Sequence, residues 1–280
     1  MLDQAAELRN LVSQASRDTQ QSHGPQPRLV VLAGGKGGVG VTTLAINVAI
    51  SLVDQGLRVV LIDADLYRAD VATLCRLPER GHLGDILSAR RDIHEVLERG
   101  PGGILVVPGV WAPDHEIPFS LHAQHRLVRQ IRSLGRHADI VLIDVGSASS
   151  DAVHRFWFGA DEVVLVTTPD AVSVMDCYAT VKTALAGGAA PDALRLIVNK
   201  VEDPAQATDV HRRMDQSAWR FLQRHITALG SVMRDPEVVR AASLATPLML
   251  SIPTCPAARG VEAVAAALAA TQTNTKRTAA

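Results

Sequence analysis

A glycine-rich loop between an apolar run and a helical pattern is the feature that most limits what this chain can fold into. The loop reads Gly-Gly-Lys-Gly-Gly-Val-Gly-Val-Thr-Thr over residues 34–43. Residues 28–33 suit a buried parallel strand, and residues 42–55 repeat apolar positions at helical spacing. This order predicts a phosphate-binding loop, because glycine backbones can turn their N–H groups toward phosphate oxygens and the helix N-terminus favours anions. The alternative, a glycine-rich turn without a ligand, leaves the closing Thr42 and Thr43 unexplained.

The loop departs from the general phosphate-loop pattern, G-x-x-x-x-G-K-[ST], at its lysine position. Gly35 and Gly40 occupy the two glycine positions and Thr42 the Mg²⁺-binding hydroxyl position, but Val41 stands where the lysine is expected. A second lysine, Lys36, lies at the start of the loop. A charge-assisted hydrogen bond contributes about 1.5–3 kcal/mol. Its loss predicts weak nucleotide binding and slow or absent hydrolysis.

Composition limits the protein class. The chain has 280 residues, 47% of them hydrophobic and only 3% aromatic, so it can build one large α/β domain or two small ones with aliphatic cores. A formal net charge of −1 argues against a broad nucleic-acid surface. Cys75, Cys177 and Cys255 are far apart, which favours reduced thiols in a cytoplasmic protein. The polar N-terminus is unlike a signal peptide, and no apolar run is long enough to span a bilayer.

Patterns along the chain predict four segments. They are an amphipathic helix over 1–18, a polar linker over 19–27, an α/β domain over 28–270 and a disordered tail over 271–280. Strand and helix signals alternate in the domain, which predicts a mostly parallel sheet with helices on both faces. The further strands are expected at 58–62, 104–107, 139–143, 162–167, 194–198 and 227–232, and helices at 123–134, 171–186 and 205–223.

Three aspartates follow expected strands. Asp63 and Asp65 come after one apolar run and Asp144 after another. The carboxyl ends of the strands are where an open α/β sheet binds ligands, so these carboxylates should emerge beside the phosphate loop. Mg²⁺ bridging two phosphates takes such oxygen ligands, mostly through water. A single aspartate there is usually a turn residue or helix cap, but three beside this loop favour a Mg²⁺–nucleotide site.

Over residues 28–265 these motifs resemble the MinD/ParA superfamily of P-loop ATPases, whose deviant loop has a lysine at the position of Lys36. The resemblance implies that ATP and Mg²⁺ are the cofactors. It assigns Asp65 to orienting the attacking water and Asp63 to supporting the metal, with Lys36 as the third catalytic residue. It places metal contacts at Thr42, Asp63 and Asp144, and an adenine contact at Asn199. The implied ATP-binding residues are Gly35, Lys36, Gly37, Gly38, Val39, Gly40, Val41, Thr42, Thr43 and Asn199. In the family Lys36 would reach the partner's nucleotide in an ATP-dependent homodimer, although it could also fold back within its own chain.

Two stretches resemble one branch in particular, the FlhG/FleN (YlxH-like) regulators of flagellar number and placement. One is the C-terminal region 221–259, and the other is Asp3-Gln4-Ala-Ala-Glu-Leu8-Arg9, which matches the D-Q-A-x-x-L-R element of that branch. The resemblance implies that the N-terminal helix activates an FlhF-like GTPase, with Gln4 entering the partner's nucleotide site. The implied partner-binding residues are Asp3, Gln4, Leu8, Arg9 and Leu11. The alternative is an ordinary amphipathic helix that packs on its own domain.

The C-terminal sequence lacks the basic amphipathic membrane helix of MinD-type proteins. Residues 261–270 are alanine-rich without a bulky aromatic residue, so an autonomous membrane anchor is not expected. The leading hypothesis is a regulatory switch of the FlhG/FleN type. The alternatives are a nucleotide-binding scaffold without turnover, a ParA-like positioning ATPase that uses DNA, and an amide- or urea-forming ligase. The near-neutral charge disfavours the DNA hypothesis, and no substrate site is evident for the ligase.

Overall fold

The computed structural model describes residues 26–65, 68–78, 80–110, 121–147, 154–157, 159–186 and 189–278. The expected N-terminal helix, with Asp3, Gln4, Leu8, Arg9 and Leu11, lies outside the described residues. The domain boundaries expected from the sequence stay a prediction. Helix α12 (Pro256–Thr278) continues through most of the segment for which the sequence predicts a disordered tail.

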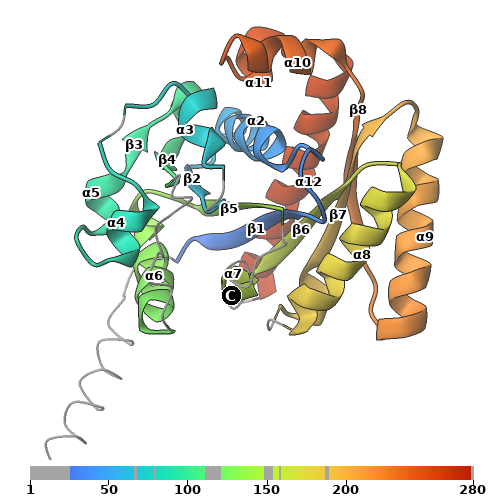
Figure 1. Cartoon of the computed structure of the whole chain (residues 1–280), viewed down its shortest axis with the longest axis horizontal. Helices are drawn as coiled ribbons and strands as arrows, with labels where there is room; N and C mark the ends of the chain where they lie inside the picture. The colour runs from blue at the N-terminus through green and yellow to red at the C-terminus, as the bar shows by residue number, and fades with distance from the viewer. Residues whose placement is uncertain are drawn as a thin grey trace, which may run out of the picture.

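An eight-stranded sheet organises the described part of the chain, in the order β3-β4-β2-β5-β1-β6-β7-β8 (Figure 1). Every pairing is parallel except that of β3 with β4 at one edge. The strands are β1 (Arg28–Gly34), β2 (Val59–Asp63), β3 (Glu98–Arg99), β4 (Leu105–Val107), β5 (Ile140–Ser147), β6 (Glu162–Thr167), β7 (Leu194–Val201) and β8 (Thr227–Met233).

Helices cover both faces of this sheet, as the sequence predicts (Figure 1). The α-helices before β6 are α2 (Val41–Asp54), α3 (Asp70–Leu74), α4 (Leu83–Leu87), α5 (Ile93–Val96), α6 (Leu121–Ser133) and α7 (His154–Trp157). Those after β6 are α8 (Ala171–Ala186), α9 (Pro204–Leu222), α10 (Pro236–Ser243), α11 (Leu248–Ser251) and α12. Short 3₁₀ turns occupy Pro101–Gly103, Leu134–Arg136 and Pro191–Ala193.

The strands are nearly continuous apolar runs because each is buried on both faces. In β1, Val30 and Leu32 pack into the core formed with α2 and α12, whereas Leu29 and Val31 pack into the core formed with α4 to α9. Strand β1 lies between β5 and β6, so the direction in which strands are added to the sheet reverses beside it. Such a reversal leaves a crevice at the carboxyl ends of the strands, and the glycine loop follows β1 at that edge.

Candidate nucleotide site

Close packing shapes the glycine loop between β1 and α2. A Cβ on Gly35 would lie 2.3 Å from the backbone of Asp176 in α8, so only glycine fits there. Gly40 has a φ of +96°, and a Cβ on it would lie 2.6 Å from the Asn199 side-chain nitrogen. These two positions require glycine for different reasons, the first because of a neighbouring helix and the second because of backbone angle and a polar neighbour.

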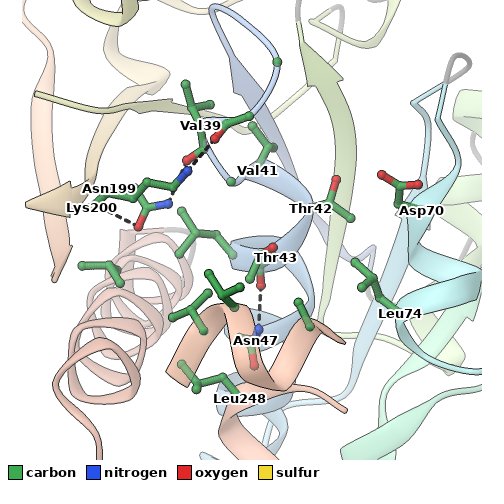
Figure 2. Close-up of a pocket in the computed structure, with 18 of the residues that line it drawn as sticks. Val39, Val41, Thr42, Thr43, Asn47, Asp70, Leu74, Asn199, Lys200 and Leu248 are labelled. Atoms are coloured by element: carbon green, nitrogen blue, oxygen red, sulfur yellow. Dashed lines mark hydrogen bonds between the residues drawn. The ribbon is translucent and has the colours of Figure 1, made fainter. Parts of the chain in front are cut away.

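The loop borders a cavity of about 440 Å³ (Figure 2). Residues 36–43 of the loop and the start of α2 form one wall, and Asp65 and Asp70 lie on the side of β2. The lining also includes Asn199 and Lys200 at the end of β7, together with apolar residues of α10 and α11. The cavity thus combines loop residues whose backbone amides can bind phosphate with apolar side chains that can pack against a base. This combination suits a nucleotide.

Val41 is the first residue of α2 and is only 5% exposed. Its side chain belongs to the apolar core that α2 and α12 form with the sheet, together with Val39 and Leu44. A lysine here would provide a cation beside the phosphates. The structure instead has an apolar contact that helps to fix α2 against the sheet.

The two strand-end carboxylates behind the loop are buried. Asp144 is fully buried, accepts hydrogen bonds from the Gly146 amide (2.9 Å) and the Thr42 hydroxyl, and has one oxygen, Oδ2, without a protein partner. Asp63 is 1% exposed and accepts from the amides of Asp65 (3.2 Å) and Val71 (3.1 Å). Burial and the neighbouring carboxylates raise the pKa of Asp63 well above its usual value and the pKa of Asp144 to about 6.

The oxygen atoms of the residues expected to hold the metal suit Mg²⁺. Asp144 Oδ2 is a buried oxygen without a partner, and the adjacent Thr42 hydroxyl is the other expected oxygen ligand. The described residues contain no cluster of three or more metal-binding side chains of the histidine, cysteine, aspartate or glutamate type. Mg²⁺ usually keeps several waters and takes only one or two carboxylates with substrate phosphates, so such a cluster is not needed.

Lys36 folds back on its own chain in this structure. Its Nζ lies 2.9 Å from Oδ1 of Asp170, which follows β6. The same carboxylate accepts from the hydroxyls of Thr168 and Ser173 and from the Ser173 amide, and these hydrogen bonds lower the pKa of Asp170. Because the Lys36 and Asp170 side chains are 35% and 51% exposed, the ion pair is worth at most about 1 kcal/mol. Lys36 can therefore exchange this partner for another at little cost.

Asn199 lines the cavity, but both ends of its amide bind the protein (Figure 2). Nδ2 donates to the Val39 carbonyl at 2.8 Å, and Oδ1 accepts from the Lys200 amide at 2.9 Å. The adenine contact implied for this residue stays a prediction.

Lys200, Asp170 and Arg234 are not among the site residues expected from the sequence. Lys200 Nζ donates to the Gly38 carbonyl at 2.7 Å, and Arg234 lines the cavity from the end of β8. The only feature of the sequence that points to Lys200 as a site residue is its place directly after Asn199. Arg234 carried no such signal.

A protein-family model, the CobQ/CobB/MinD/ParA nucleotide binding domain, matches residues 30–248. The chain belongs to this family. The match confirms the resemblance that the glycine loop and the strand-end aspartates indicate.

Among curated relatives of this MinD/ParA-family chain, the antiactivator FleN of Pseudomonas aeruginosa is 29% identical over 238 residues, which are 85% of each protein. The flagellum site-determining protein YlxH of Helicobacter pylori is 26% identical over 216 residues, covering 76% of this chain and 72% of the relative. The similarity to these two proteins agrees with the branch that the sequence resembles.

Solved structures confirm the fold. The cell division ATPase MinD of Pyrococcus furiosus superposes with a TM-score of 0.71 at 22% identity, covering 87% of this chain and 99% of that one. MinD of Pyrococcus horikoshii, solved with Mg-ADP, gives 0.71 at 21% identity and covers 88% and 98%. No helix in the described part of the chain has the length and apolar character needed to cross a membrane.

Proposed function

We propose that this chain is an ATP-dependent regulatory switch of the FlhG/FleN type that acts in the cytoplasm. ATP–Mg²⁺ binds at the glycine loop and favours a homodimer, and the N-terminal segment stimulates an FlhF-like GTPase. The switch thereby controls the number or placement of a surface structure such as the flagellum. The similarity to FleN over 85% of each protein is the observation that carries this proposal.

Loop geometry and the strand-end acids support ATP–Mg²⁺ as the ligand. The amides of residues 37–43 receive the phosphates at the N-terminus of α2, and Thr42 with Asp144 and Asp63 holds the metal, which neutralises charge on the phosphates. The MinD of Pyrococcus horikoshii was solved with Mg-ADP. The apolar part of the cavity, with Val238 and Leu248, receives the base.

Hydrolysis is expected to be slow. Asp65 lies at the cavity and is 9% exposed, where it can orient a water molecule toward a terminal phosphate. The position that supplies a lysine in other phosphate loops holds the buried Val41. Charge that develops on the phosphates in the transition state therefore lacks one stabilising contact. A switch that acts through its ATP-bound state tolerates such slow turnover.

The partner-directed part of the proposal is tested with a peptide. A synthetic peptide of residues 1–20 should stimulate an FlhF-like GTPase from the same organism, because a glutamine can position a hydrolytic water. Gln4→Ala should abolish the stimulation while leaving binding intact, and Gln14→Ala in the same peptide is the matched control. If the peptide has no effect and its deletion instead unfolds the ATPase domain, the N-terminal helix is structural.

The buried position of Val41 favours a second candidate, a scaffold that binds nucleotide without turnover. The two candidates differ in what Val41→Lys does. A switch with a weakened site should gain affinity or hydrolysis rate from the restored lysine. A scaffold whose loop has lost its function should gain neither.

A further inference from the structure

Two consecutive residues at the end of β7 hold two consecutive carbonyls of the glycine loop. Asn199 Nδ2 donates to Val39 O at 2.8 Å and Lys200 Nζ donates to Gly38 O at 2.7 Å (Figure 2 shows the first). Both contacts join segments about 160 positions apart in the sequence. Fixing carbonyl orientation on one side of a loop also fixes the orientation of the amides next to them, which are the groups that bind phosphate.

The backbone of Lys200 is itself in an uncommon conformation. Its φ is +58°, in the left-handed region that non-glycine residues rarely adopt. Such a conformation is strained and persists where the surrounding structure enforces it, commonly at ligand sites. Here the Asn199 side chain stabilises the Lys200 backbone conformation, because its Oδ1 accepts a hydrogen bond from the Lys200 amide at 2.9 Å.

Lys200 also differs from its basic neighbours in its partners. A second, polar cavity of about 530 Å³ lies on the other side of the loop. Lys36, Lys200 and Arg234 line both cavities. Lys36 pairs with Asp170 and Arg234 pairs with Glu202, whereas within the described residues no carboxylate pairs with Lys200. Its ammonium has three donors, of which the Gly38 carbonyl takes one.

We propose that Lys200 is the phosphate-binding cation of this chain, holding the loop through Gly38 and supplying the positive charge that Val41 does not. The inference rests on the proposed binding of ATP. An ammonium within hydrogen-bond reach of the loop and without a carboxylate partner is free to donate to a bound polyphosphate. Lys200 thus supplies the positive charge that a lysine at position 41 would supply. It does so from the end of β7, and not from the start of α2.

A double-mutant cycle tests this directly. Affinity for Mg²⁺–ATP and for AMP is measured by displacement of a fluorescent ATP analogue from the full chain, from Lys200→Met and Val41→Lys, and from the double variant. Lys182→Met, which removes an exposed lysine from α8, is the matched control. Lys200→Met should weaken ATP binding about tenfold, as loss of a charge-assisted hydrogen bond predicts. AMP binding should weaken much less, and in the Val41→Lys background the ATP loss should fall to threefold or less.

The outcomes separate this inference from the proposed function. If the unmodified chain binds no ATP, the proposed function fails and the inferred charge role fails with it. If the chain binds ATP but Lys200→Met behaves as Lys182→Met does, or weakens ATP and AMP equally, only the inference is overturned. Hydrogen exchange without nucleotide tests the hold on the loop: amides 37–40 should exchange faster in Lys200→Met. If these amides exchange at the same rate in Lys200→Met as in the parent chain, Lys200 does not hold the loop.

Discussion

Asp63 and Asp144 lie opposite each other on the neighbouring parallel strands β2 and β5, and both are almost completely buried. Burial disfavours their ionised forms, and each carboxylate lies close to other acids of the site. Without a cation this arrangement destabilises the folded chain at neutral pH. With Mg²⁺ bound, the same carboxylates have the counter-charge that they lack.

The Mg²⁺-free chain should therefore lose stability as the pH rises. The pKa of Asp144 is 3.8 unfolded and about 6 folded, so between these values the folded state binds more protons than the unfolded one. Stability then falls with rising pH, by up to about 3 kcal/mol once both states are ionised. Asp144→Asn keeps an oxygen acceptor and removes this charge. In urea unfolding without Mg²⁺, the variant should be more stable than the parent at pH 7 and similar at pH 4. A variant that is less stable at pH 7 would contradict the assignment.

Glycine substitutions in the loop should have unequal effects. Gly38 and Gly40 both have a positive φ, of +84° and +96°. A Cβ on Gly38 would meet nothing within 4 Å, whereas one on Gly40 would lie 2.6 Å from Asn199 Nδ2. Gly38→Ala carries only the backbone cost of about 1 kcal/mol, while Gly40→Ala also displaces Asn199 from Val39. Urea unfolding and ATP titration should therefore show the larger losses for Gly40→Ala. Equal losses would exclude a role for the Asn199 contact.

Val41→Lys should raise ATP affinity and lower stability together. The new ammonium gains a phosphate contact, worth about tenfold or more in affinity. The apolar core around α2 loses a buried branched side chain, which costs about 1–3 kcal/mol in the nucleotide-free chain. Val41→Met controls for side-chain length without charge and should leave ATP affinity unchanged. Calorimetric titration measures the ATP affinity, and denaturant unfolding measures the stability. If Val41→Met also raised the ATP affinity, the gain would come from side-chain packing and not from the added charge.

Much of the fold could be predicted from the sequence. The parallel strands are buried on both faces of the sheet, so each one can be recognised as a continuous apolar run. The expected strand at 162–167 matches β6, and the expected helix at 171–186 matches α8. The antiparallel β3, at Glu98–Arg99, was missed because two residues at a sheet edge give no periodic signal. Helices α3, α4 and α5 have four or five residues and were missed for the same reason.

The site was predictable where residue type and position along a strand decide it, and not where long-range contacts do. Thr42, Asp63 and Asp144 come together as expected because parallel strands end at one edge. The contact of Lys200 with Gly38 joins residues 162 positions apart, so neither sequence segment alone indicates it. The partner of Lys36 in this structure, Asp170, likewise depends on how the loop after β6 packs beside the glycine loop.

ATP binding to this site is expected to switch the chain from a monomer to a dimer, and sedimentation velocity measures that change. Isologous pairing is the commonest oligomer geometry, and Lys36 can leave its weak pair with Asp170 for the partner's phosphates. The chain and its Asp65→Ala variant should sediment as monomers with Mg²⁺–ADP and as dimers with saturating Mg²⁺–ATP. Lys36→Ala should stay monomeric with either nucleotide. A monomer under saturating Mg²⁺–ATP in both the parent chain and Asp65→Ala would rule out an ATP-dependent dimer switch.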